Sequence, residues 1–351
     1  MAVGLPLKTT YADGDVYSAS DVNDTNGTVN AYVPTGKAAG VNKIINGDYG
    51  VWQRGTSFTA TNATLYSADR FIGVSDATFT QSRQTFTPGA APVAGYEGQY
   101  FFRNAKSAGG SYFSLDQRIE NVQTFAGQTV TFSFWLKSSA ATTIRLRLSQ
   151  NFGSGGSASV DNTATDFTST TSWVRYSKTF TLASISGKTI GTSSYLNAAI
   201  INVTASAVDL DIWGVQLEAG STATAFQTAT GTIQGELAAC QRYYWRTGAG
   251  DIYSSYGNGL AKSGNNAFII VVPPVTMRII PYAIDGTGTA SNYAIYDGVS
   301  VTAATALGFD RPVPNCFSLT ISVASGLTTY RPVALINNNL STAFIGFSAE
   351  L

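Results

Sequence analysis

One Gly-rich stretch of the sequence brings aromatic, amide and carboxylate side chains close together. Residues 251–266 read DIYSSYGNGLAKSGNN, and the candidate ligand-binding residues within them are Asp251, Tyr253, Tyr256, Asn258 and Asn265. An aromatic ring can stack on the C–H face of a sugar, while amides and carboxylates bond its hydroxyl groups. Loops displayed on a rigid β scaffold commonly carry binding residues. The stretch therefore predicts a carbohydrate-recognition loop.

Trp135 is a second candidate for stacking on a sugar. It lies in residues 129–137, TVTFSFWLK, where apolar side chains occupy every second position from Val130 to Leu136. Successive side chains of a strand point to opposite faces, so Trp135 should lie on the face away from this apolar row. That face could equally contact another subunit or a helix. We interpret Trp52, Trp173 and Trp213 as core or strand-closing residues.

Catalysis has few residues to draw on, because the sequence contains no histidine. This excludes Ser-His and Cys-His nucleophiles, His-ligated zinc and imidazole acid–base chemistry. Glycoside hydrolysis needs two carboxyl groups roughly 5 to 9.5 Å apart, and Asp209 and Asp211 would lie about 7 Å apart on one strand face. Alternating aspartates usually form a solvated face, so we expect no enzyme.

Composition excludes several further classes of protein. The 21 basic and 21 acidic residues balance and are scattered, so we expect no nucleic-acid partner. The longest apolar run is too short to span a bilayer, and no signal peptide is recognisable. We therefore expect that the protein is synthesised in the cytoplasm and does not insert into a membrane. Cys240 and Cys316 are expected to be buried free thiols, although the sequence leaves open whether they approach each other.

A short helix with a narrow apolar seam is predicted near the N-terminus, between a cap at Ser18 or Ser20 and Pro34. Val22, Val29 and Tyr32 follow a three-four-three spacing together with Thr25. Such a short seam is too weak to stand alone, and three parallel copies would bury it. The seam predicts an oligomer interface, and the alternative is a helix lying on the next domain.

A second short helix is predicted within residues 227–246. Ile233, Leu237, Cys240 and Tyr244 recur at spacings of four, three and four, the period of one helical face. Thr230 and Thr232 are candidate N-caps. With a glycine inside, this helix should be marginal alone. We predict that three copies pack these four residues at a threefold junction, and an ordinary linker is the alternative.

The rest of the chain is predicted to be mainly β. Alternating apolar and polar residues separated by Gly, Ser, Asn and Asp clusters are typical of β-sandwiches. Four parts follow: an N-terminal attachment arm with a short coiled-coil-like helix (1–41), a β-sandwich (42–226), a linker with a short helix (227–246) and a C-terminal β-sandwich tip domain (247–351).

Several segments, in this order, resemble bacteriophage tail-fibre and capsid-fibre proteins. They are ADGDVYSASDVNDT, INGDYGVWQRGTSF, YSADRF, AGQTVTFSFWLKSS, TSWVRYSKTFTL, SGKTIGT, VQLEAGSTATAF and ELAACQRYYWR, within about residues 10–246. VVPPVTMRIIP and FIGFSAEL are similar to the distal domains of such fibres. The resemblance implies a jelly roll similar to carbohydrate-binding modules, in a virion appendage that is commonly homotrimeric.

The resemblance also raises the question of calcium. Jelly rolls of the carbohydrate-binding kind often hold a structural calcium through an Asp-Asp-Val step in the last strand, but the corresponding residues here are Trp213, Gly214 and Val215. Calcium takes six to eight oxygen ligands. We expect no metal and no cofactor, although Asp48, Asp211 and Glu218 stay possible ligands.

The expected function is that of a bacteriophage receptor-binding fibre. The resemblance implies attachment to other virion proteins through the N-terminal arm and recognition of a host-surface polysaccharide by the C-terminal end. The protein would be assembled in the host cytoplasm and exposed on the particle. The alternatives are a structural collar or decoration fibre without a ligand and a polysaccharide-cleaving fibre.

Overall fold

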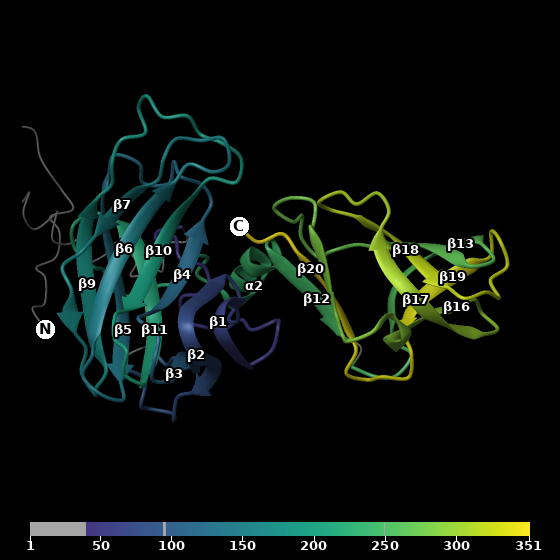
Figure 1. The fold of residues 1–351 in the computed structure, drawn as a ribbon, viewed down its shortest axis with the longest axis horizontal. Coiled ribbons are helices and arrows are strands. Elements are labelled where there is room, and N and C mark those ends of the chain that lie inside the picture. Colours follow the sequence, from purple (N-terminus) through teal and green to yellow (C-terminus); the bar gives the residue numbers. More distant parts are fainter. Residues whose placement is uncertain (1–39, 94–95, 249) are drawn as a thin grey trace, which may run out of the picture.

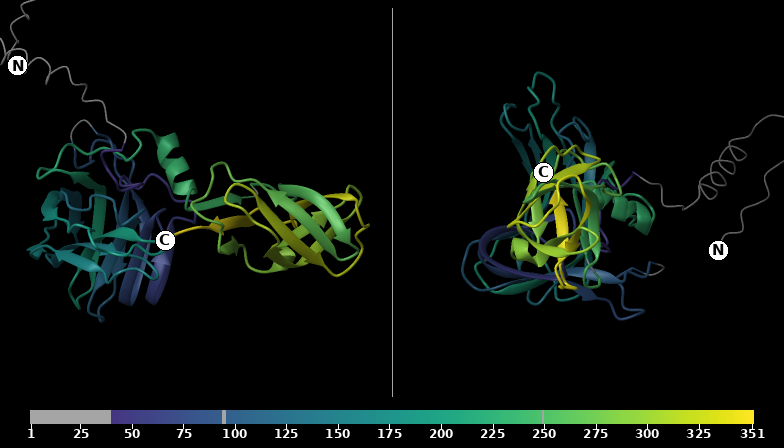
Figure 2. Two further views of the ribbon diagram at one scale, coloured as in Figure 1. Left: turned by 90° about the horizontal axis from the view of Figure 1, so that it is seen from above. Right: turned by 90° about the vertical axis from the view of Figure 1, so that its right-hand side faces the viewer.

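The computed structural model describes residues 40–93, 96–248 and 250–351, and these form two β bodies in line with α2 between them (Figures 1 and 2). The prediction of a mainly β protein is confirmed. The N-terminal arm and the predicted seam residues Val22, Val29 and Tyr32 lie outside the described residues. Among the described helices, none has the length and apolar character needed to cross a membrane.

The first body is built from eleven antiparallel strands. They are β1 (Ser57–Tyr66), β2 (Phe71–Thr85), β3 (Tyr100–Lys106), β4 (Phe113–Ile119), β5 (Thr129–Ser138), β6 (Thr143–Asn151), β7 (Val160–Thr163), β8 (Phe167–Thr168), β9 (Val174–Thr181), β10 (Tyr195–Asn202) and β11 (Val208–Ala219). The order is β7-β6-β10-β4-β2-β3-β11-β5-β9, with β1 beside β2 and β8 beside β6. The eleven strands of this body therefore form one hydrogen-bonded sheet, and nine of them follow a single path.

The long strand β2 divides that path into two layers. Its first residues, from Phe71 to Ser75, pair with β4, whereas the part from Phe79 to Thr85 pairs with β3. Apolar side chains from β4, β6 and β10 share one core with side chains from β5 and β11. Because the inward residues of both halves meet in this core, the sheet folds over into a sandwich like a jelly roll.

The linker helix α2 (Ile233–Gln241) is where the sequence predicts it, with Thr232 as N-cap accepting a hydrogen bond from the Gly235 N–H. Three of the four predicted stripe residues, Ile233, Leu237 and Cys240, lie in α2. Tyr244 begins β12 (Tyr244–Gly248) instead of continuing the helix. Cys240 and Tyr244 are 0% and 1% exposed within a single chain, whereas Ile233 and Leu237 are 56% and 38% exposed. Within a single chain, Ile233 and Leu237 are therefore the stripe residues that remain exposed.

The second body contains a closed barrel and a small sheet. The barrel runs β13-β14-β18-β17-β16-β19 and the sheet runs β12-β20-β15. Their bounds are β13 (Ser255–Ser263), β14 (Asn266–Val271), β15 (Ala283–Gly286), β16 (Tyr293–Tyr296), β17 (Val301–Phe309), β18 (Phe317–Val323), β19 (Pro332–Asn337) and β20 (Phe344–Ser348), with a 3-10 turn, η1, at Ala290–Asn292. The six barrel strands thus close on themselves and have no edge strand, whereas β12 and β15 are the edges of the small sheet.

A buried network of charges joins the two bodies. After β20 the chain crosses to the jelly roll, where the Glu350 carboxylate pairs with Arg70 and lies 3.2 Å from an Arg54 guanidinium nitrogen. Arg54 also lies 3.5 Å from Asp69, whose burial raises its pKa to about 6. The Tyr66 hydroxyl donates to the Leu351 carbonyl at 2.9 Å. Glu350 and Leu351 therefore pack against the jelly roll.

Candidate functional site

The outer face of the first layer carries a row of polar side chains. Along β4, β6 and β10 the apolar residues point into the core, and alternate residues point outward. The outward positions include Asp116 and Arg118 on β4, Arg147 and Ser149 on β6, and Asn197 on β10. Period-2 alternation places every second side chain of a strand on one face. A polar surface spanning several strands is therefore built by local sequence.

Strand register brings these side chains together. Asn197 lies opposite Ser149 on one side and opposite Arg118 on the other. Ser149 in turn lies opposite Asp161 of β7. One row across four strands thus reads Asp161, Ser149, Asn197, Arg118. The surface is hollowed along this row, and all four of these residues line the hollow.

This groove has a volume of about 320 Å³, within the usual range of ligand pockets. It is lined by Asp116, Arg118, Arg147, Ser149, Asn151, Ser159, Asp161, Tyr195 and Asn197. The groove stands at the carboxyl end of β6, where Asn151 lies opposite Tyr195. We call it the jelly-roll groove.

Its buried polar atoms are only partly paired. The Asn197 amide donates to Asp116 at 2.8 Å, and Ser114 also donates to Asp116. Burial raises the pKa of Asp116. Within the described part of the chain, the side-chain oxygen Oδ1 of Asn197 and Nε of Arg147 are buried without a hydrogen-bond partner. The Arg147 side chain as a whole is 37% exposed, so its terminal N–H groups are the ones that a ligand in the groove can reach.

Charge in the groove is balanced. Arg118 and Arg147 face Asp116 and Asp161, and Arg147 lies 3.9 Å from Asp161. The Arg118 guanidinium lies over the Tyr195 ring at 4.9 Å, which fixes the ring at one end of the groove. Two cations and two anions leave no net charge to select an ion. The donors, acceptors and ring suit a neutral polyhydroxyl ligand.

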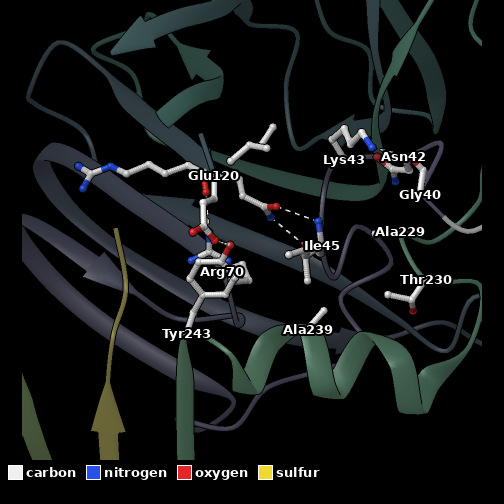
Figure 3. A pocket seen from close by; sticks show the side chains of 13 residues that line it. Gly40, Asn42, Lys43, Ile45, Arg70, Glu120, Ala229, Thr230, Ala239 and Tyr243 are labelled. Atoms are coloured by element: carbon white, nitrogen blue, oxygen red, sulfur yellow. Dashed lines mark hydrogen bonds between the residues drawn. The ribbon is translucent and has the colours of Figure 1, made fainter. Parts of the chain in front are cut away.

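A second cavity, of about 250 Å³, lies between α2, β4 and residues 40–45 (Figure 3). Its main polar groups already bond one another. The Ile45 N–H donates to the Gln117 side chain, which donates back to the Ile45 carbonyl, both at 2.8 Å. Glu120 accepts from the Tyr243 hydroxyl at 2.9 Å. This cavity is therefore a packing junction between α2 and the sheet rather than a ligand site.

The groove lies in a segment similar to known sugar-binding modules. A family model described as a carbohydrate binding domain matches residues 94–194. That segment includes the groove residues from Asp116 to Asp161, and Tyr195 and Asn197 follow it directly. The match covers less than a third of the chain. No curated protein matches the sequence.

Solved structures of low sequence identity are similar to about half of the chain. A module bound to β-1,4-galactotriose is 11% identical, with a TM-score of 0.31, and covers 51% of this chain and 99% of its own. The CBM22-1 xylan-binding domain of Paenibacillus barcinonensis is 12% identical (TM-score 0.33; 53% and 98%). The enzymatically active domain of a Bacteriophage CBA120 tailspike protein is 13% identical (TM-score 0.30; 51% and 22%).

Trp135 does not provide a free ring for a sugar. It does lie on the face away from the main core, but it is only 8% exposed. It packs in an aromatic cluster with Phe86, Phe101, Trp213 and Phe226, and the Arg175 guanidinium lies 4.5 Å from its ring centre. The loop after β2 and the segment after β11 supply Phe86 and Phe226, which cover this face. Trp213 and Trp52 are buried, as predicted.

The residues singled out in 251–266 do not converge on one site. Tyr256 is 7% exposed and belongs to the barrel core. Asp251 lies in the turn before β13, where its carbonyl accepts from the Asn337 amide at 2.7 Å. Tyr253 is 47% exposed, and Asn265 lies in the turn between β13 and β14. Asn258 is exposed on β13.

Two of the carboxylates considered for catalysis or calcium, Asp211 and Glu218, are held by other side chains. Arg103 donates two hydrogen bonds to Asp211, at 2.6 and 2.8 Å, and Lys137 lies 3.2 Å from it. Glu218 accepts from the Thr224 hydroxyl at 2.6 Å. Among the described residues, no group of three or more acidic or cysteine side chains could hold a metal ion. Cys240 and Cys316 are free, and Cys240 is buried.

Sequence reasoning missed the jelly-roll groove, although part of its signal was present. The alternation of Ile144, Leu146 and Leu148 with Arg145 and Arg147 indicates an outward-facing pair of arginines on β6. The sequence near β6 does not indicate that Asn197 and Arg118 complete the row. Their strands become neighbours only through pairing across large sequence separations.

Proposed function

We propose that the protein binds glycans through the jelly-roll groove. The carrying observation is a charge-balanced groove in which Arg118, Arg147 and Asn197 lie beside the Tyr195 ring. The match to a carbohydrate binding domain over residues 94–194 supports the same ligand class. Binding without catalysis is the proposed activity, since the match is to a binding domain and Asp211 is held by two basic side chains.

Replacing Arg147 with methionine should weaken glycan binding by about tenfold or more, because hydrogen bonds to charged groups contribute about 1.5–3 kcal/mol. Arg145→Met is the matched control, since Arg145 lies two residues earlier on the same face of β6 and pairs with Asp166 outside the groove. The measurement is binding of the full chain to an array of bacterial surface polysaccharides and defined oligosaccharides. Equal binding by both variants would contradict the proposed site.

In its biological setting, we propose that this protein is a fibre on a bacteriophage particle that recognises host-surface polysaccharide. The ordered segments that resemble phage fibre proteins support this role. The N-terminal arm would attach to other virion proteins. Immunogold labelling should place the protein on an appendage of the particle, and label confined to the host cytoplasm would contradict the role. Release of oligosaccharide from a bound polysaccharide would instead favour a cleaving fibre.

The proposed assembly is a homotrimer, supported by two apolar residues of α2 that remain exposed in the single chain. Leu237→Asp should convert a species near three times 36.9 kDa into monomer, because it places a charge in an apolar contact. Ile190→Asp is the control, since Ile190 is 39% exposed against 38% for Leu237. Light scattering gives the masses. A monomeric unsubstituted protein, or an unaffected trimer in Leu237→Asp, would count against this junction.

A further inference from the structure

We propose that the barrel carries a second saccharide site, which takes one pyranose residue of a neutral glycan in a groove across β13, β19 and β16. This inference rests on the proposed glycan-binding function and extends it to a different part of the chain. The groove, here called the barrel groove, has a volume of about 470 Å³. It lies in the body opposite the jelly roll, at the end where Figure 1 labels β13, β16 and β19.

Strand pairing sets the floor and walls of the barrel groove. Ala334 of β19 lies opposite Asn258 of β13 and opposite Tyr296 of β16. One row therefore places a small side chain between an amide and an aromatic ring. Gly259 and Pro332 continue the floor. A floor of small residues between longer side chains makes a depression of the width of a sugar ring.

Tyr296 supplies the stacking surface. Its side chain is 43% exposed, although it ends a strand whose other residues are buried. Asn258 is also exposed. In the residues that the structure describes, neither the Asn258 amide nor the Tyr296 hydroxyl has a hydrogen-bond partner. An aromatic ring with an amide across a shallow floor is the combination that contacts the C–H face and the hydroxyl edge of a pyranose.

A fixed ion pair completes the groove at the β16–β17 turn. Asp297 accepts hydrogen bonds from the Val299 and Ser300 N–H groups at 3.0 and 2.7 Å, and these bonds lower its pKa. Its second oxygen lies 3.3 Å from an Arg331 guanidinium nitrogen. Arg331 is therefore oriented by a carboxylate that the turn holds. Its other N–H groups remain to donate to sugar hydroxyls.

The balance of charge selects the ligand class. Asp297 and Arg331 neutralise each other, and no other Asp, Glu, Lys or Arg is among the described residues that line the barrel groove. An anionic sugar would compete with Asp297 for the arginine, whereas a neutral pyranose requires no change in the pair. The two grooves are therefore lined by the same kinds of group: oppositely charged side chains, an aromatic ring and an asparagine amide. Two sites on one chain would raise the avidity for a repeating polysaccharide.

The experiment uses the full chain and saturation-transfer difference NMR with methyl glycosides of galactose, glucose, mannose and xylose as probes. Tyr296→Ala and Arg331→Met should each weaken binding of at least one probe tenfold or more. Tyr282→Ala, which removes a 61% exposed tyrosine from outside the barrel groove, should leave all binding unchanged. Because Tyr296 and Arg331 are partly exposed, circular dichroism should show both variants folded, and Asn258→Ala gives a third, milder variant.

Arg147→Met separates this inference from the proposed function. Binding that survives in Arg147→Met and is lost in Tyr296→Ala supports the barrel groove, and loss of different probes in the two variants supports both grooves. Wild-type binding in all three barrel-groove variants would overturn the barrel site while leaving the jelly-roll groove intact. Absence of any signal from the unsubstituted protein would overturn the assignment of neutral pyranoses to the barrel groove.

Discussion

Replacing Glu350 with alanine is expected to destabilise the protein by about 3–5 kcal/mol, the cost of removing one member of a buried ion pair. Arg70 is 1% exposed and would keep its charge without the Glu350 carboxylate. Arg54 would lose a contact at 3.2 Å as well. The neighbouring Asp69 carboxylate is 3.5 Å from Arg54 and cannot replace both interactions.

Urea denaturation followed by fluorescence measures this loss. Asp166→Ala is the control, because it breaks an ion pair with Arg145 whose side chains are both more than a third exposed, and such surface pairs contribute about 0–1 kcal/mol. Glu350→Ala and Asp166→Ala should therefore differ by several-fold in their effect. Equal midpoints for the two variants would show that the charge network at the junction is not needed for stability.

Trp213→Ala is the second large effect, with an expected loss of about 3–5 kcal/mol. The Trp213 side chain is fully buried, and its ring centroid lies 4.8 Å from that of Phe226 and 5.4 Å from that of Trp135. Its removal leaves a cavity between the sheet and the two segments that cover it. Those segments would lose the surface against which they pack.

Trp173→Ala is the matched control, because Trp173 is only partly buried at the margin of the same cluster. It should cost clearly less in a thermal-unfolding comparison. The pair also tests the nature of the aromatic face. If Trp213→Ala kept its stability and lost glycan binding, this face would be a sugar platform rather than a second small core.

Much of the fold follows from local sequence, and the alternation in residues 129–137 illustrates why. Val130, Phe132, Phe134 and Leu136 all face the jelly-roll core, because the strand period is fixed by backbone geometry. The same pattern predicts the side on which Trp135 lies. It could not predict its burial, since the covering residues Phe86 and Phe226 are about 50 and 90 residues away.

The linker shows where local periodicity stops being sufficient. Tyr244 has the spacing of the helical stripe, yet it pairs with Ser348 of β20. Its hydroxyl donates to Asp285 at 2.6 Å, and the Arg54 guanidinium lies 3.6 Å from its ring centre. These long-range contacts outweigh a marginal helix. Both grooves likewise depend on the register between strands that are distant in sequence. The sequence therefore contains the groove residues, but it does not show that they lie close together.

The return of residues 349–351 to the jelly roll has a mechanical consequence. The barrel is tied to the jelly roll twice, once through the chain from α2 into β12 and once through the segment that follows β20, which Figure 1 shows ending between the two bodies. Arg278 clamps the second tie by donating to the Ala349 and Glu350 carbonyls at 2.9 and 2.8 Å. A single linker would let the barrel swivel. Two adjacent ties resist twisting, so torque applied to the barrel passes into the jelly roll.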